Sequence, residues 1–191
     1  MNRTNWQLSI LDRRTQTEIM KIPRFNATGT YSNNNVNAAR ISFPPDVFEQ
    51  TSIRAAGHWV WLQNLEEPRA SLYGPITQAR YDLDDEEGRE VNLTVSDWMA
   101  EPLEQVVFDP IAAIGNPIEM AKLLLKSSKV STPMRVVSHA TEGVFPLMVE
   151  RYQTIGDWWS TLGLLLPWNV EARTLVLGRS PAAPIPITQK A

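Results

Sequence analysis

Hydrophobic and polar positions alternate through most of the first hundred residues. The clearest runs are residues 6–10, where tryptophan, leucine and isoleucine alternate with polar side chains, and residues 90–96, where valine and leucine do so. A period of two is typical of a strand with one buried face. Short strands separated by turn-rich stretches favour a small β-sandwich or β-barrel. Further strands are predicted over residues 18–25, 39–43, 58–62 and 70–83.

The pattern changes after residue 97. The sequence Asn116–Pro117–Ile118–Glu119 combines an N-cap residue, a proline at the first helical position and a glutamate at the third. This arrangement predicts a helix that runs to Lys126. A second helix is predicted over residues 158–165, and a closing hairpin over residues 168–177.

The expected fold class is therefore α+β and mainly β: a small, split-barrel-like β-barrel followed by a smaller helix-and-strand module. The barrel is expected over residues 1–105. The α+β module, packed on or beside the barrel, is expected over residues 106–180. Residues 181–191 are rich in proline and alanine and predict an extended C-terminal arm.

Composition narrows the classes of function. The chain has 191 residues, 43% of them hydrophobic, and a formal net charge of −3. It has no basic run, which argues against binding to the nucleic-acid backbone and against sequence-specific recognition of nucleic acid. The longest apolar run, residues 162–168, is too short to cross a bilayer, so no membrane contact is expected. With no cysteine, the chain has neither disulfides nor a cysteine nucleophile.

No motif for catalysis or for cofactor binding is present. The chain lacks a Gly-x-Ser-x-Gly elbow and the glycine-rich phosphate-binding loops. His58 and His139 are far apart and form no metal-spacing pair, and the acidic run at residues 82–87 lacks the pattern of a calcium loop. We therefore predict no catalytic, cofactor-binding or metal-binding residues, and no enzyme. A hydrolase using Asp97 or Glu142 as its acid is the weakest of the hypotheses, because no positioned base accompanies either residue.

Seven tryptophans are many for a chain of this length. Trp59 and Trp61 lie on the same face of a predicted strand, whereas Trp158 and Trp159 are adjacent on a predicted helix and point roughly 100° apart. Because tryptophan is enriched at subunit interfaces, these four residues are the interface candidates. An alternative function is a carbohydrate-binding β-sandwich that uses Trp59, Trp61 or Trp98 as an exposed stacking platform.

Several segments in a fixed order carry a resemblance to a known family. They are a leading strand at residues 6–12, the segment Tyr73–Gly74–Pro75–Ile76, the strand Val91–Asp97 that ends in aspartate, and residues 150–158. Together they resemble the N-terminal part of phage tail hub proteins, which include the baseplate hub proteins of contractile tails and related minor tail proteins of siphophages.

The resemblance implies a structural component of a phage tail tip or baseplate hub. Such a protein joins the tail tube or distal tail ring to the central spike or fibre. It implies other tail proteins as partners, a homo-oligomer of usually three copies, and a place in the tail of the virion after assembly in the host cytoplasm. Long hub proteins continue through further domains, whereas this chain ends at Ala191, so one half of a hub split over two chains is a further possibility.

Overall fold

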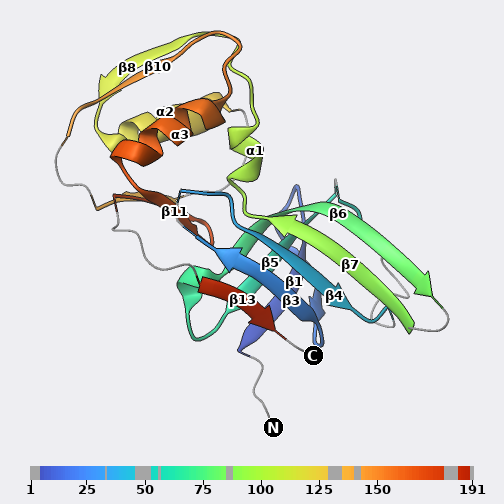
Figure 1. Cartoon of the computed structure of the whole chain (residues 1–191). Coiled ribbons are helices and arrows are strands. Elements are labelled where there is room, and N and C mark those ends of the chain that lie inside the picture. Colours follow the sequence, from blue (N-terminus) through green and yellow to red (C-terminus); the bar gives the residue numbers. More distant parts are fainter. Residues whose placement is uncertain are drawn as a thin grey trace. The chain divides into compact units, whose positions relative to one another are not determined.

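A computed structural model describes residues 5–32, 34–45, 53–55, 57–84, 88–128, 135–139, 143–178 and 185–189. The chain divides into two compact units (Figure 1). The first, which we call the sheet unit, comprises Met1–Tyr31, Asn37–Asp97 and Pro184–Ala191. The second, which we call the mixed unit, comprises Ser32–Val36 and Trp98–Ala183.

The sheet unit is built on one antiparallel sheet that curls on itself. The strand order is β13-β3-β4-β7-β6-β5-β1-β2. The strands are β1 (Trp6–Asp12), β2 (Glu18–Ile22), β3 (Asn26–Tyr31), β4 (Ala38–Phe43), β5 (His58–Asn64), β6 (Leu72–Asp84), β7 (Gly88–Ser96) and β13 (Ile185–Gln189). A 3-10 turn at Pro68–Ala70 precedes β6.

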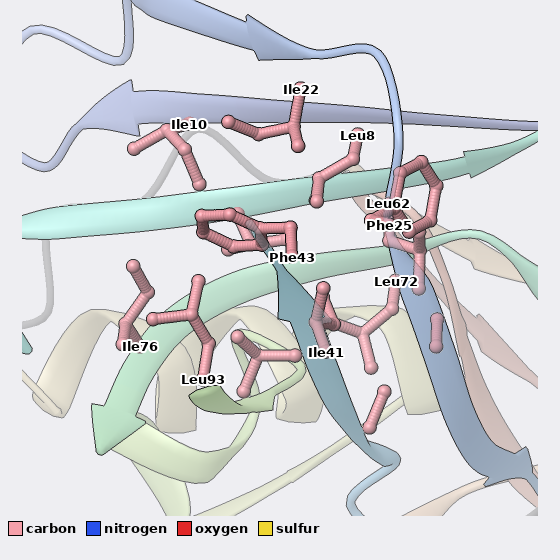
Figure 2. Close-up of a cluster of buried hydrophobic side chains, with 14 of the residues drawn as sticks. Leu8, Ile10, Ile22, Phe25, Ile41, Phe43, Leu62, Leu72, Ile76 and Leu93 are labelled. Atoms are coloured by element: carbon pink, nitrogen blue, oxygen red, sulfur yellow. The ribbon is translucent and has the colours of Figure 1, made fainter. Parts of the chain in front are cut away.

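The core of this unit lies along the inner face of the curled sheet (Figure 2). The register places Leu8 of β1 opposite Leu62 of β5, and Leu62 opposite Leu72 of β6. Ile41 of β4 faces Leu93 of β7 in the same way. Burying each such side chain stabilises the fold by roughly 1.5–3 kcal/mol. The apolar side chains that alternate along the sequence therefore form one continuous layer on the inner face of the sheet.

The two edges of the sheet are formed by β2 and β13. A proline follows directly after β2, at Pro23, and Pro186 lies within β13 opposite Thr30. Proline has no N–H to donate, so it is tolerated at a sheet edge and limits further strand addition.

Strand β13 differs from the predicted C-terminal arm. Residues 185–189 pair with β3, and the side chain of Ile187 is fully buried in the core. Two isoleucines in a proline-rich stretch were too weak a signal to predict this pairing with a distant strand.

In its described residues, the mixed unit combines three helices with two small sheets. Strands β8 and β10 form a two-stranded antiparallel ribbon, and β11, β12 and β9 form a three-stranded sheet in which β12 and β9 run parallel. The elements are α1 (Ala100–Leu103), β8 (Ile111–Gly115), α2 (Pro117–Ser127), β9 (Arg135–Ser138), β10 (Phe145–Val149), α3 (Ile155–Leu165), β11 (Trp168–Glu171) and β12 (Thr174–Leu177). No helix in the described part of the chain is long and apolar enough to cross a membrane.

Both long helices begin with a capping box. In α2, Asn116 Oδ1 accepts from the Glu119 N–H at 2.9 Å, and Glu119 Oε2 accepts from the Asn116 N–H at 3.3 Å. In α3, Thr154 and Asp157 exchange the equivalent bonds, at 3.1 and 3.0 Å. Each box satisfies two backbone N–H groups at the start of its helix. The helix start predicted at Asn116 is confirmed.

The mainly β, α+β fold class is confirmed, with a curled sheet in place of a closed barrel. The two compact units differ from the expected division at residue 105. The boundary between the two units lies between Asp97 and Trp98 instead. The segment Ser32–Val36 also belongs to the mixed unit. Strand β8 had not been predicted, because Ile111–Gly115 is short and alanine-rich.

The sheet unit contains one buried carboxylate among its described residues, Asp97, which is 1% exposed. Its Oδ2 accepts from the Asn37 N–H at 2.6 Å and from Asn37 Nδ2 at 3.0 Å, and its own N–H donates to Asn37 O at 2.8 Å. Hydrogen bonds to a charged acceptor are stronger than neutral ones. The pair therefore ties the start of β4 to the end of β7.

Replacing Asp97 tests this connection. We expect Asp97→Ala to lower the free energy of unfolding by about 1–3 kcal/mol, because the Asn37 donors lose a buried acceptor. Urea unfolding followed by tryptophan fluorescence measures the change. The exposed Asp109→Ala change should alter the stability by less than about 0.5 kcal/mol. Equal effects of the two substitutions would contradict the structural role of Asp97.

The capping box of α3 predicts a pH dependence. Hydrogen bonds from the backbone and side chain of Thr154 lower the pKa of Asp157 below its usual value of 3.8. A lowered pKa in the folded state means that the ionised carboxylate stabilises the fold above pH 3.8, and that this stabilisation is lost as the pH falls through the lowered pKa. Asp157→Ala should therefore be less stable than wild type at neutral pH, and the difference should shrink as the medium becomes strongly acidic. Thermal unfolding across this range measures it, and a difference independent of pH would contradict this role of the carboxylate.

Candidate interaction surface

The β8–β10 ribbon of the mixed unit has a fixed register. Ile111 lies opposite Val149, Ala112 opposite Met148, Ala113 opposite Leu147, Ile114 opposite Pro146 and Gly115 opposite Phe145. Directly paired residues of an antiparallel ribbon point to the same face, and successive pairs alternate between faces. The ribbon thus has two faces, and the side chains of both are almost entirely apolar.

One face of the ribbon is covered by helices. Strand β10 packs against both α2 and α3, and β8 packs against α2 (Figure 1). Leu147 and Val149 on this face are buried, at 2% and 1% exposure. The helices contribute buried residues such as Met120 and Leu124 of α2 and Ile155 of α3. This face is therefore part of the unit's own core.

The opposite face is apolar and open. Ile114 is 75% exposed and Met148 is 71% exposed, and Val144, just before β10, is 73% exposed. Pro146 and Ala112 complete the same face and are also exposed. We call these five residues the ribbon face. Single exposed hydrophobic residues are ordinary, but a contiguous row of them marks an interaction site.

Two exposed aromatic residues flank the end of the ribbon at which Ile111 pairs with Val149. Phe108 precedes β8 and Tyr152 follows β10, and their rings meet edge to face with centroids 6.4 Å apart. The Arg151 guanidinium carbon lies 5.1 Å from the centroid of the Tyr152 ring. We call Phe108 and Tyr152 the aromatic corner. Such rings supply large contact area at low entropic cost, which is why they are enriched in interfaces.

The backbone at the aromatic corner is held in an unusual conformation. Tyr152 has a φ of 69°, a region that bulky side chains rarely adopt. Its N–H donates to Val107 O at 2.7 Å, and the Val107 N–H donates to Gln153 O at 2.9 Å. These two hydrogen bonds hold the backbone of the turn in place, and the Tyr152 side chain is 66% exposed. Backbone strain held in this way is typical of functional sites.

The predicted interface candidates Trp59 and Trp61 belong to the sheet unit. Their neighbours Val60 and Leu62 point into the core, so both indoles lie on the outer face of the sheet. Both rings stack edge to face on Tyr73, with centroids 5.2 and 6.5 Å apart.

The turn between β1 and β2 covers part of this outer face. The Tyr73 hydroxyl donates to the Gln16 side chain, and the Arg13 N–H donates to Gly57 O at 3.1 Å. Trp59 is 2% exposed, whereas Trp61 is half-buried.

The other two candidates lie on α3. Trp159 is 1% exposed and packs between Trp158 and Trp168, with ring centroids 5.6 and 5.7 Å away. Trp158 is half-buried. A role for these four tryptophans in a subunit interface remains a prediction, and Trp61 and Trp158 are the two that still present surface.

Trp98, considered for a sugar platform, is completely buried, and its Nε1 donates to Ala172 O at 2.9 Å. Because Trp59 and Trp98 are both enclosed, neither offers an open ring face to a sugar.

Of the two residues considered for catalysis, Asp97 is buried and bonded to Asn37, and Glu142 lies outside the described residues. His58, considered as a metal ligand, accepts at Nδ1 from the Arg54 N–H at 2.9 Å. The tip of the acidic run, residues 85–87, also lies outside them. Within the described ranges, no cluster of three histidine, aspartate or glutamate side chains could hold a metal ion.

The ribbon face and the aromatic corner were missed by the sequence analysis. The available signal was the stretch Phe145–Val149, in which apolar residues continue without polar alternation. Such a run predicts a strand buried on both faces. Only the register with β8 reveals that one of these faces is open.

Three solved structures show what the fold is similar to. A 43 kDa tail protein of prophage MuSo2 from Shewanella oneidensis aligns with 91% of this chain and 54% of its own, with a TM-score of 0.60 and 12% identity. A tail protein from Neisseria meningitidis aligns with 91% of this chain and 50% of its own, at a TM-score of 0.59 and 12% identity.

The third structure is an E. coli component of the type VI secretion system, described as structurally similar to the T4 bacteriophage tail proteins gp27 and gp5. It aligns with 80% of this chain and 45% of its own, at a TM-score of 0.56 and 12% identity. No protein-family model matches the chain, and no curated protein matches it by sequence.

The similarity therefore rests on structure. The chain spans about half the length of the first two solved structures it matches. Across nine-tenths of its length, this chain has the fold found in phage tail proteins.

Proposed function

We propose that the chain is a structural component of a phage tail tip or baseplate hub. In this role it joins the tail tube or distal tail ring to the central spike or fibre. The observation that carries the proposal is the open ribbon face in a chain whose fold is found in phage tail proteins. A protein that works by assembly needs such surfaces, which are buried only when its neighbours are in place.

The partners in this proposal are other tail proteins, and the ribbon face with the aromatic corner is the surface that binds one of them. The chain forms a homo-oligomer, usually of three copies around the tail axis. It assembles in the host cytoplasm and resides in the tail of the virion. Its role is geometric, and no catalytic step is assigned to it.

A carbohydrate-binding module is the less favoured alternative. It requires exposed indole rings on which a sugar can stack, and two of its three candidate tryptophans are 0% and 2% exposed. Trp61 alone is half-buried. Titration of the pure chain with host-surface glycans should therefore leave its tryptophan fluorescence unchanged.

The ribbon face can be tested in tail assembly. We expect Ile114→Ser combined with Met148→Ser to reduce incorporation into tails by at least about tenfold, because truncating central apolar anchors costs interfaces about 2 kcal/mol or more. The measurement is quantitative mass spectrometry of particles from a phage whose own copy of the gene is deleted and complemented by the variant.

A matched control removes two exposed hydrophobic residues elsewhere. Ile19→Ser combined with Leu65→Ser changes side chains of the sheet unit that are 40% and 48% exposed. This control should incorporate at the wild-type level. If both variants incorporated normally while remaining folded by circular dichroism, the ribbon face would not be an assembly surface.

A further inference from the structure

The register of the β8–β10 ribbon continues beyond the ends of its two strands. An isolated antiparallel bridge pairs Val106 with Thr154. Val106 stands five residues before Ile111, and Thr154 stands five residues after Val149, so the bridge repeats the alignment of the ribbon. The aromatic corner lies between the bridge and the ribbon. The ribbon face and the aromatic corner are therefore two parts of one longer paired structure.

Exposure alternates along this extension as it does in the ribbon. Val106 and Phe108 are exposed, whereas Val107 between them is buried. On the opposite segment Tyr152 is exposed, and its ring meets that of Phe108. We call Val106, the aromatic corner and the ribbon face together the apolar strip. At about 3.3 Å per residue, the strip is at most about 30 Å long.

The covered face of the same ribbon shows what kind of element fits it. Helices α2 and α3 pack there, through buried apolar residues such as Met120, Leu124 and Ile155. An α-helix with its side chains is about 10 Å across, and 18–20 residues of helix span about 30 Å. One such helix matches the length of the apolar strip. It would place the ribbon between two helical layers, which is a common way to bury both faces of a sheet.

Acidic side chains accompany the apolar strip. The two segments that form it, residues 104–115 and 143–157, carry four carboxylates and one cation: Glu104, Asp109, Glu150, Asp157 and Arg151. All four acidic residues are exposed. The guanidinium of Arg151 already lies over a ring of the aromatic corner. Four negative charges and one positive charge give these segments a formal net charge of −3, equal to that of the whole chain.

Two of these carboxylates stand beside the aromatic corner. Asp109 directly follows Phe108, and Glu150 lies between the ribbon face and the aromatic corner along the chain. Within the described ranges, neither carboxylate forms an ion pair or a hydrogen bond. The exposed lysines of α2, Lys122 and Lys126, belong to a helix that packs on the other face of the ribbon. The apolar strip is therefore complementary to a segment that carries cations beside its apolar residues.

We propose that the apolar strip binds an amphipathic helix of another tail protein, with lysine or arginine residues beside its apolar face. The inference rests on the proposed function and names the kind of segment that docks on the surface assigned there. Apolar residues spaced three and four apart on the helix cover the strip. Its cations pair with Asp109 and Glu150, which selects basic helices over acidic ones.

Two peptides and the pure chain test the docking. Both peptides are amphipathic helices of about 18 residues, the length that matches the strip, with leucine on one face. The polar face carries lysine in one peptide and glutamate in the other. We expect the lysine peptide to bind at least about tenfold more tightly than the glutamate peptide, because only its charges complement the strip. Isothermal titration calorimetry measures the two dissociation constants.

Charge reversal on the protein should invert this preference. Asp109→Lys combined with Glu150→Lys should bind the glutamate peptide more tightly than the lysine peptide, because cations then flank the apolar strip. Circular dichroism checks that the variant is folded. If the reversed variant does not fold, D109N/E150N replaces it and should reduce the preference for the lysine peptide.

Nuclear magnetic resonance locates the bound peptide. In a chain with ¹³C-methyl methionine, the Met148 signal should shift when the lysine peptide is added, whereas that of the fully buried Met99 should change little. Met148→Leu assigns the first signal. Ile114→Ser combined with Met148→Ser should weaken binding of the lysine peptide at least about tenfold. The control Ile19→Ser combined with Leu65→Ser should stay within about twofold of wild type.

Four results would overturn the docked helix. They are no binding of the lysine peptide, equal binding of both peptides, a preference that the Asp109 and Glu150 variants leave unchanged, and a Met148 signal that moves with protein concentration in the absence of peptide. The last result would assign the apolar strip to a second copy of the chain. Because these experiments use the pure chain, their failure leaves the tail role to be decided by incorporation. A failure of incorporation would likewise leave peptide binding measurable.

Discussion

A two-stranded ribbon cannot bury both of its faces with one layer of helices. The β8–β10 ribbon has apolar side chains on each face, and α2 and α3 cover only the face that carries Leu147 and Val149. The side chains of the opposite face, including Ile114 and Met148, remain exposed to solvent. Exposed apolar surface of this kind is unfavourable in isolation and becomes favourable when a partner removes it from water. The proposed role in assembly follows from this imbalance.

The sheet unit presents a different kind of surface. Its mainly aliphatic core lies on the inner face, and prolines stand at or beside both edge strands, so neither edge is an open template for another strand. Its outer face carries the aromatic group of Trp59, Trp61 and Tyr73, which the turn between β1 and β2 covers in part. In the proposed assembly, the main open apolar surface is therefore the ribbon face of the mixed unit.

Local features of the fold could be predicted from sequence, and features that depend on distant partners could not. The capping box at Asn116 and Glu119 involves residues three apart, so its pattern is complete in the sequence. The pairing of β13 with β3 joins two distant parts of the chain. The proline content of residues 181–191 predicted an extended arm instead.

The interaction surface shows the same limit. Period-two alternation identified the faces of β5, but not the turn near Gln16 that encloses Trp59. Likewise, the ribbon face exists only because Ala112 and Met148 are brought opposite each other. Tryptophan content supplied the interface candidates, whereas the residues of the ribbon face are aliphatic.

The most direct test of a role in the tail is to locate the chain in phage particles by immunogold electron microscopy with an antibody against it. We expect gold label at the tail tip or baseplate, with none on the capsid or along the tail shaft. Particles without label would contradict the proposed role, provided that a known tail protein is labelled in the same preparation after mild disruption has exposed the tips.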